Sequence, residues 1–332
     1  MAAPFRNQMP PGSGARAPIK VVLTGVENAG KTSILKVLDE DFVHVHHVRP
    51  TKGVERSTMS LLGLTIVRWD LGGQDEYRRR YLEDLEHHFG DARLLAFVVD
   101  VQEGDESRVE KMFEYFRRVA AHVASTPKDA RPAAFVVLLH KFDPELLEDP
   151  ATLSRARDLR ERFEVIAGGE FDLEYYWTSV FDRATMVTVL SQLLLRVVPR
   201  REIIEDELRR VGEGLPSPAL LVADSTPVVL GRVQAAALSD RDEAEFTRAL
   251  LRNVAKLRDA QPPLEPVVEL FTPAASFFLL PFDAAGERFF FAALVDRFAI
   301  QEPRDLEDLR ARLEAATGNV RKVLGTFYGK LP

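Results

Sequence analysis

Cysteine is absent from the 332-residue chain. This absence excludes disulfide bonds, cysteine-containing metal sites, and prenyl or palmitoyl groups attached to cysteine. No apolar run approaches the roughly 20 residues that a membrane-spanning helix needs. The first residues lack the apolar core of a secretory signal, and Ala2 stands where N-myristoylation requires glycine. We therefore expect a cytoplasmic protein with no direct membrane anchor.

An excess of positive charge is also lacking. The net charge of −7 argues against nucleic acid as a main partner, because nucleic-acid binding needs a basic face. The chain is 46% hydrophobic and 29% charged, which is ordinary for a globular protein. Its length suggests about two domains. Residues 1–18 are rich in proline and glycine and are expected to form a flexible tail.

The chain does contain a glycine-rich phosphate-binding sequence, GVENAGKT, at residues 25–32. The apolar residues 19–24 before it predict a strand, and residues 31–39 predict a helix. Strand, GxxxxGK[ST] and helix together form a P-loop, in which backbone N–H groups and the helix N-terminus favour a bound phosphate. Lys31 is expected to reach the β- and γ-phosphates, and the Thr32 hydroxyl is expected to ligate Mg²⁺.

Strands and helices are predicted to alternate as far as residue 199. Further strands are expected at residues 55–62, 64–70, 93–101, 134–139 and 171–177, with a hairpin turn at Gly63, and helices at 108–123 and 184–197. This alternation predicts an α/β domain with a mostly parallel sheet between helices. In such sheets the ligand binds beyond the C-terminal ends of the strands.

A second module is predicted after Pro199, where the composition changes. Its helices are expected at residues 200–213, 240–258 and 302–324, and its strands at 219–223, 227–231, 267–271, 276–282 and 288–295. The order α-β-β-α-β-β-β-α indicates an α+β domain. We expect the phenylalanines of its strands to lie mainly in the core and, secondarily, at an interface with another chain.

Two further strand ends carry side chains that suit a nucleotide. Asp70 ends one strand and is a candidate for holding Mg²⁺, while Gly73 and Gln74 are placed to contact a γ-phosphate and to orient an attacking water. Asp143 follows another strand. Its carboxylate can accept from guanine N1–H and the 2-amino group, which adenine lacks, so Asp143 favours GTP over ATP. The Lys141 stem is expected to lie along the base plane.

The motifs GVENAGKT, PTKG, WDLGGQ, HKFD and WTSVFD resemble those of small GTPases of the Ras superfamily, with Arf-like order and spacing. The sequence at His140 and at residues 178–182 resembles the corresponding motifs of the Rag/Gtr family. That family has HKxD where most small GTPases have NKxD. The second module resembles, by element order, the roadblock/longin-type domain that mediates dimerisation in that family. The resemblance implies a small GTPase (G) domain at 19–199 and a roadblock-like dimerisation domain at 200–332.

The resemblance implies a site for GTP or GDP with Mg²⁺. The nucleotide-binding residues that it implies are Glu27, Asn28, Ala29, Gly30, Lys31, Thr32, Ser33, Gly73, His140, Lys141, Asp143, Ser179 and Val180. The implied metal ligands are Thr32, Thr51 and Asp70, and the implied catalytic residues are Gln74, Lys31 and Thr51. Residues 42–56 and 72–90 are then the switch segments, which loss of the γ-phosphate releases.

We expect no catalytic or metal-binding role for the other clusters of arginine and histidine. The arginines at 78, 79 and 80 are consecutive on a predicted helix and point in different directions, so we expect a solvated or partner-binding face. The histidines at 44, 46 and 47 lack a cysteine or a close carboxylate pair to complete a zinc set. His87 and His88 are adjacent helical residues that do not share a face.

The implied function is a GTP-binding regulatory switch that hydrolyses GTP slowly, an activity of the EC 3.6.5 type, and whose nucleotide state controls partner binding. The dimer can be homomeric or heteromeric, and the sequence identifies no regulator or effector. Two alternatives remain. One is a GTP-binding scaffold that scarcely hydrolyses. The other is an Arf-like prokaryotic polarity or motility GTPase with a fused roadblock-type regulator.

Overall fold

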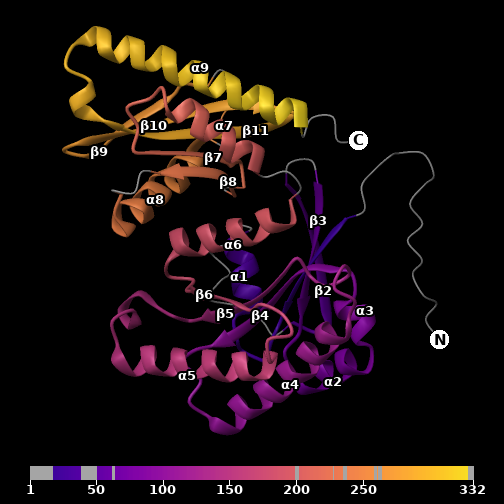
Figure 1. The fold of residues 1–332 in the computed structure, drawn as a ribbon. Coiled ribbons are helices and arrows are strands. Elements are labelled where there is room, and N and C mark those ends of the chain that lie inside the picture. Colours follow the sequence, from indigo (N-terminus) through magenta and orange to yellow (C-terminus); the bar gives the residue numbers. More distant parts are fainter. Residues whose placement is uncertain are drawn as a thin grey trace, which may run out of the picture.

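The computed structural model describes residues 18–38, 51–61, 64–198, 202–226, 228–234, 238–257, 260 and 264–327. Within these ranges, two β-sheets follow one another along the chain (Figure 1). Several predicted features lie outside the described residues: the tail up to residue 17, most of the first switch segment, the histidines at 44, 46 and 47, and the hairpin turn at Gly63. Among the described helices, none has both the length and the apolar character needed to span a membrane.

The first sheet has six strands and is mostly parallel, as predicted. Its strands are β1 (Ile19–Thr24), β2 (Val54–Leu61), β3 (Leu64–Leu71), β4 (Ala92–Asp100), β5 (Ala134–His140) and β6 (Glu174–Thr178). They lie in the order β2-β3-β1-β4-β5-β6. Only β2 and β3 pair antiparallel, as the predicted hairpin requires. Strands β3, β1, β4 and β5 run parallel to one another, so their carboxyl ends lie at the same edge of the sheet.

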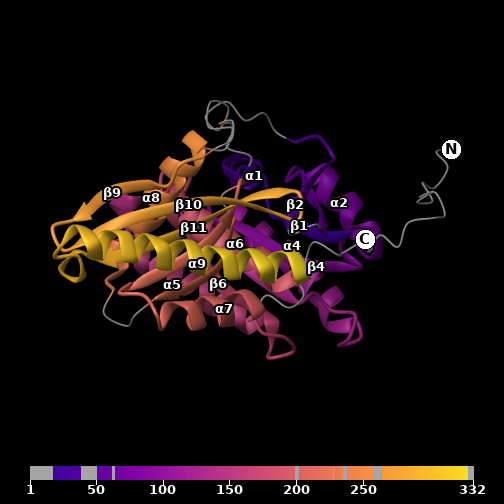
Figure 2. The ribbon, with the colours of Figure 1, turned by 90° about the horizontal axis from the view of Figure 1, so that it is seen from above.

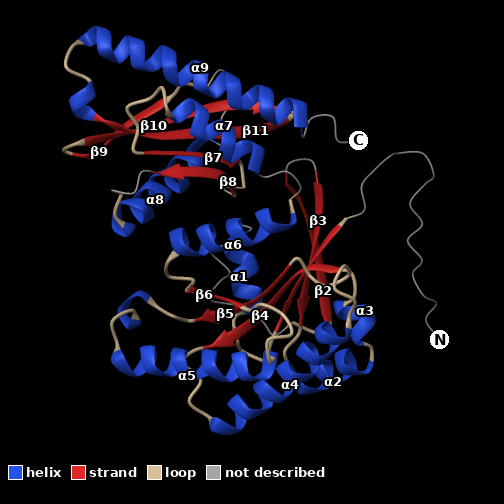
Figure 3. Cartoon of the chain, viewed as in Figure 1, coloured by secondary structure: helices blue, strands red, loops and turns tan. Residues whose placement is uncertain are grey.

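Helices cover both faces of this sheet (Figure 3). One face carries α1 (Lys31–Leu38) and α6 (Arg183–Val197). The other carries α2 (Asp75–Glu83), α3 (Leu85–Phe89), α4 (Glu106–Ser125) and α5 (Pro150–Ala167). Along β1, Val21 and Leu23 pack toward α1 and α6, whereas Val22 packs on the opposite face. Successive side chains of a strand point to opposite faces of the sheet, so β1 contributes to the apolar layers on both faces.

The second sheet belongs to a C-terminal domain. Its elements are α7 (Glu202–Gly212), β7 (Ala219–Asp224), β8 (Val229–Gln234), α8 (Asp240–Leu257), β9 (Val267–Thr272), β10 (Ala275–Ala284), β11 (Glu287–Asp296) and α9 (Pro303–Phe327). The antiparallel order is β8-β7-β11-β10-β9, which leaves β9 at an edge. Helix α8 packs on one face, and α7 and α9 pack on the other, where α9 runs along the sheet (Figure 2).

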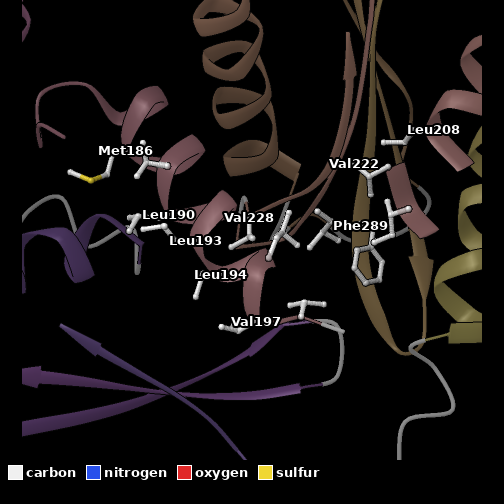
Figure 4. Packing of buried hydrophobic residues seen from close by; sticks show 14 of the residues in the cluster. Met186, Leu190, Leu193, Leu194, Val197, Leu208, Val222, Val228 and Phe289 are labelled. Carbon is white, nitrogen blue, oxygen red and sulfur yellow. The ribbon is translucent and has the colours of Figure 1, made fainter. Parts of the chain in front are cut away.

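Helix α6 joins the two halves. Its residues Met186, Leu190, Leu193, Leu194 and Val197 belong to one apolar cluster with Val228, Val222, Leu208 and Phe289 of the C-terminal domain (Figure 4). The backbone N–H of Val229 donates to Ser191 Oγ at 3.0 Å in this buried layer. Arg248 of α8 also lies 4.0 Å from Asp182, the residue that caps the N-terminus of α6.

Two features differ from the sequence prediction. Strand β6 begins at Glu174 and not at Phe171, whose ring stacks on Phe135 at a centroid distance of 5.2 Å. Helix α5 is present although its apolar pattern did not predict it. Asp149 caps it by accepting from the Thr152 N–H at 2.8 Å, and Pro150 follows at the first helical position, where a proline is tolerated.

Candidate functional site

The P-loop adopts a conformation that directs Lys31 back into the loop. Asn28 and Gly30 have φ of 63° and 93°, so the backbone reverses sharply between β1 and α1. The Lys31 ammonium donates to the carbonyls of Gly25 at 3.2 Å and Val26 at 2.8 Å. Burial lowers the pKa of Lys31 to about 8, although the nearby Asp70 carboxylate opposes that shift. A buried cation here favours a neighbouring anion.

A cavity of about 730 Å³ opens beside this loop. Its lining residues are Val26, Glu27, Asn28, Gly30, Lys31, Thr32, Ser33, Thr51, Gly73, Gln74, Asp75, Arg78, Glu103, Arg108 and Lys111. The size is within the range of small-molecule sites. Basic side chains outnumber acidic ones in this lining, four to three, and the N-terminus of α1 adds partial positive charge, so the cavity suits an anionic ligand. Of the predicted nucleotide-binding residues at 27–33, Ala29 alone lies outside the lining, and it is fully buried.

The three predicted metal ligands lie together at the edge of the cavity. Thr32 Oγ1 is 2.5 Å from Asp70 Oδ2 and 2.9 Å from Thr51 Oγ1, and Thr51 Oγ1 is 3.0 Å from Asp70 Oδ2. The other carboxylate oxygen, Asp70 Oδ1, is buried without a hydrogen-bond partner. Two hydroxyls and a carboxylate are the oxygen ligands that Mg²⁺ prefers, so the residues fit this ion. No cluster of three or more His, Asp or Glu side chains competes for a metal within the described ranges.

The segment after β3 lies directly against the P-loop. A Cβ added to Gly73 would lie 2.4 Å from the Glu27 backbone nitrogen, so only glycine allows this approach. The Gly72 N–H donates to the Gly53 carbonyl at 2.9 Å, and the Tyr81 hydroxyl donates to the same carbonyl at 2.8 Å. The segment that carries Thr51 is therefore tied to the segment that carries Gly73 and Gln74.

The predicted base-recognition residues lie together at the ends of β5 and β6. Asp143 accepts from Ser179 Oγ at 2.6 Å and from Gln102 Nε2 at 3.1 Å. Lys141 has φ of 60° and its ammonium donates to Asp100 Oδ2 at 2.6 Å. These contacts hold the Asp143 carboxylate and the Lys141 stem in fixed positions. Val180 packs against the apolar layer beneath α6.

His140 joins this group to the P-loop. Its ring is 2% exposed, and Nδ1 lies 3.0 Å from Thr178 Oγ1. A Cβ on Gly30 would lie 2.3 Å from His140 Cδ2, so the imidazole packs against the glycine itself. Burial lowers the pKa of His140 to about 4, and the Lys141 charge acts in the same direction. The ring is therefore neutral at pH 7.

One sequence interpretation is wrong. Arg78 does not belong to a solvated face: its side chain is only 11% exposed and lines the cavity. The reason is helical geometry, because Arg78 lies one turn after Gln74 and shares its face. Arg79 and Arg80 are exposed, as predicted. The sequence analysis also missed Asp100 and Gln102, which contact Lys141 and Asp143; the position of Asp100 at a strand end was the available signal.

Comparisons with known proteins agree with this geometry. The family model described as the Gtr1/RagA G protein conserved region matches residues 20–248. The chain is 26% identical over 215 residues to the GTP-binding protein gtr1 of Schizosaccharomyces pombe, covering 62% of this chain and 65% of the relative. It is 25% identical over 216 residues to GTP-binding protein GTR1 of Saccharomyces cerevisiae, covering 62% and 66%. The match thus spans just under two thirds of each of these two relatives.

Arf-like proteins match a shorter region. ADP-ribosylation factor-like protein 3 of Caenorhabditis elegans is 36% identical over 142 residues, covering 40% of this chain and 73% of the relative. Among solved structures, the Arl6 BBS3 small GTPase from Trypanosoma brucei, with bound nucleotide analogue GppNp, has a TM-score of 0.43 and 18% identity. It covers 54% of this chain and 96% of that one. The family match over residues 20–248 is the decisive finding: the chain belongs to the Gtr1/RagA family of G proteins.

Proposed function

We propose that this chain is a guanine-nucleotide switch that binds GTP and GDP with Mg²⁺ and hydrolyses GTP slowly. The observation that carries the proposal is the convergence of Thr32, Thr51 and Asp70 beside the buried Lys31 ammonium. Phosphoryl transfer needs positioning and charge stabilisation more than it needs covalent chemistry, and this group of residues supplies both. Because GTP is a cytoplasmic metabolite, the proposal includes a cytoplasmic location.

The proposed chemistry assigns each side chain one task. Backbone N–H groups of residues 27–33 and the Lys31 ammonium bind the phosphates. Mg²⁺, held by the Thr32 and Thr51 hydroxyls and the Asp70 carboxylate, would neutralise charge on the β- and γ-phosphates. Gln74 lines the same cavity at the start of α2, where its amide can orient the attacking water.

Selection of guanine is assigned to Asp143. Its carboxylate accepts hydrogen bonds, and guanine offers two adjacent donors where adenine offers none at those positions. Ser179 fixes one carboxylate oxygen and Gln102 the other, which limits its rotation. Lys141 is extended toward Asp100, so its stem can cover one face of the base. Backbone N–H groups at Ser179 and Val180 are assigned to the guanine carbonyl.

The switching device is the link between the two segments that would contact the γ-phosphate. Thr51 and Gly73 are joined through the Gly53 carbonyl, which accepts from Gly72 and Tyr81. Loss of the γ-phosphate would remove one anchor from each segment, so both would rearrange together. Residues 42–56 and 72–90 are therefore proposed to form the surface that regulators and effectors read.

We divide the chain into residues 1–18, a G domain at 19–199 and a roadblock-like domain at 200–332, and we assign dimerisation to the last. Support comes from β9, which lies at the edge of the second sheet with one side unpaired within that sheet. Val268 and Leu270 on this strand are 57% and 68% exposed. An exposed apolar edge strand favours pairing with another strand, so a second copy or a related chain is the proposed occupant.

The function is tested by GTP turnover on the purified chain. We expect bound guanine nucleotide and slow phosphate release that falls at least about tenfold in Gln74→Leu, because water is no longer oriented. Arg79→Ala, which alters an exposed residue of the same helix, is the matched control and should behave as the wild type. Bound GTP without turnover would favour the scaffold alternative, and bound adenine nucleotide would refute the assignment of Asp143.

A further inference from the structure

Helix α2 presents one of its three consecutive arginines to the nucleotide cavity. Gln74 stands at the N-cap position of the helix, and the Arg78 backbone N–H donates to the Gln74 carbonyl at 3.0 Å. Residues four apart lie on one face of a helix, so Gln74 and Arg78 both line the cavity. Arg80 points elsewhere and pairs with Glu76 on the exposed face at 2.6 Å.

The Arg78 guanidinium is held in place by groups of its own chain. Nη1 donates to the Gly73 carbonyl at 3.1 Å, and Nη2 pairs with the Asp75 carboxylate. The guanidinium carbon lies 5.7 Å from the centre of the Tyr115 ring. That ring is itself fixed, because its hydroxyl lies 2.6 Å from Thr24 Oγ1 in the buried core. Much of the side-chain entropy that phosphate binding would cost is therefore already lost.

Arg78 and Lys31 are two cations facing one cavity. Both side chains line it, and Arg78 is only 11% exposed. Repulsion between them is relieved when an anion enters, and it is relieved most when negative charge grows. Hydrolysis of GTP develops such charge on the transferred phosphoryl group and on the leaving oxygen. A guanidinium with several N–H donors suits both oxygens at once.

We propose that Arg78 is a catalytic residue that acts within its own chain by donating hydrogen bonds to the γ-phosphate and to the oxygen that bridges the β- and γ-phosphorus atoms. The water oxygen forms a bond to the γ-phosphorus, and the bond from that phosphorus to the bridging oxygen breaks. The electron pair stays on GDP, and the water proton passes to the released phosphate. Arg78 remains protonated throughout and stabilises the charge.

This inference rests on the proposed function and deepens it. An arginine supplied by a partner accelerates GTP hydrolysis by roughly 10³–10⁵ in G proteins, and one supplied in the same chain acts without the partner. The structure assigns the basal activity of this chain to its own arginine. A partner that repositions α2 would then regulate hydrolysis by moving Arg78 and Gln74 together.

The test compares single-turnover hydrolysis by the wild type, Arg78→Ala, Arg78→Lys and the control Arg79→Ala. We expect Arg78→Ala to lower the rate constant about a hundredfold, Arg78→Lys to restore only part of it, and Arg79→Ala to change nothing. GDP affinity of all four proteins should agree within about threefold, which shows that the cavity is intact. Uptake of aluminium fluoride onto the GDP complex, a mimic of the transition state, should occur in the wild type and be lost in Arg78→Ala.

Two results would overturn the assignment. In one, Arg78→Ala hydrolyses GTP or takes up aluminium fluoride as well as the wild type. In the other, the wild type hydrolyses GTP but takes up no aluminium fluoride on its own. Failure of the wild type to bind guanine nucleotide at all would contradict the proposed function itself, and the two failures are thereby distinguished.

Discussion

The imidazole of His140 packs against the α-carbon of Gly30, which joins the base-recognition loop to the P-loop through direct contact. A Cβ at Gly30 would lie 2.3 Å from His140 Cδ2 and 2.6 Å from Nε2. The ring is fixed on its other side by Thr178 Oγ1. Two loops that are more than a hundred residues apart in sequence are thus held in register by one buried ring.

Because of this contact, we expect Gly30→Ala to lower the unfolding free energy by more than backbone strain alone would. The methyl group would overlap the ring at a position where φ is 93°. Gly286→Ala is the matched control, because φ there is 83° and no neighbouring atom lies within 4 Å of the added carbon. We expect the control to lose about 1 kcal/mol of unfolding free energy and Gly30→Ala to lose roughly 1–3 kcal/mol more. Equal losses in chemical denaturation would contradict the contact.

The buried imidazole also predicts a pH dependence. In the folded chain the pKa of His140 is lowered to about 4, chiefly by burial, whereas the unfolded pKa is 6.5. A depressed pKa gives stability that is present above 6.5 and is lost as pH falls toward 4. Between pH 7 and pH 5 this loss amounts to about 2 kcal/mol.

The measurement is the difference between the wild type and His140→Asn in unfolding free energy at the two pH values. Asp224 acts in the opposite direction, because burial raises its pKa to about 7, but it is common to both proteins and cancels. We expect the variant to lose less stability than the wild type on acidification, and to keep or tighten guanine-nucleotide affinity. A large loss of affinity would refute the view that asparagine can replace this ring.

Asp143→Asn should weaken guanine binding. The variant keeps the size of the side chain but removes the charge, and its amide can no longer accept from both adjacent donors of guanine. We expect the dissociation constant for GDP to rise about tenfold to a hundredfold, which is typical for a hydrogen bond to a charged group. Isothermal titration against GDP measures it. Glu148→Gln, on the exposed loop that follows, is the control, and an unchanged affinity in Asp143→Asn would exclude the assigned role.

Leu270→Lys should weaken self-association if β9 is the pairing edge. The substitution places a charge on an exposed apolar position of that strand, and a lysine on an edge strand opposes pairing with another strand. Val165→Lys, at an 80% exposed position on α5, is the matched control. Light scattering after size exclusion should show a dimer for the wild type and control and a monomer for Leu270→Lys. A Leu270→Lys dimer of unchanged affinity would exclude this edge.

Much of this fold could be predicted because its strands are short apolar runs that end in chemically distinctive residues. Asp70 was recognisable because a carboxylate follows the run at 64–69, and its position beside Thr32 follows from the parallel pairing of β1 and β3. The hairpin of β2 and β3 was predictable because Gly63 separates two strand-like segments.

Other features depend on contacts between distant residues and could not be predicted. Arg78 was assigned to solvent because a helix places three neighbouring arginines in three directions, and sequence alone does not say which direction is the cavity. The contact of Val229 with Ser191 requires two domains to meet at α6. Helix α5 was missed although its buried residues, Ala156, Leu159, Phe163 and Ala167, follow the helical period, because two of the four are alanines and the apolar face is weak.

The most direct test of the account is equilibrium binding of GDP and ADP to the nucleotide-free chain, with Mg²⁺ and with Mg²⁺ chelated. The account predicts that GDP binds at least about a hundredfold more tightly than ADP, since a site built to accept from guanine leaves its carboxylate unpaired with adenine. Affinity should fall when Mg²⁺ is removed, because Thr32 and Asp70 then face the phosphates without the metal. Equal affinity for the two nucleotides, or no binding of either with Mg²⁺ present, would contradict it.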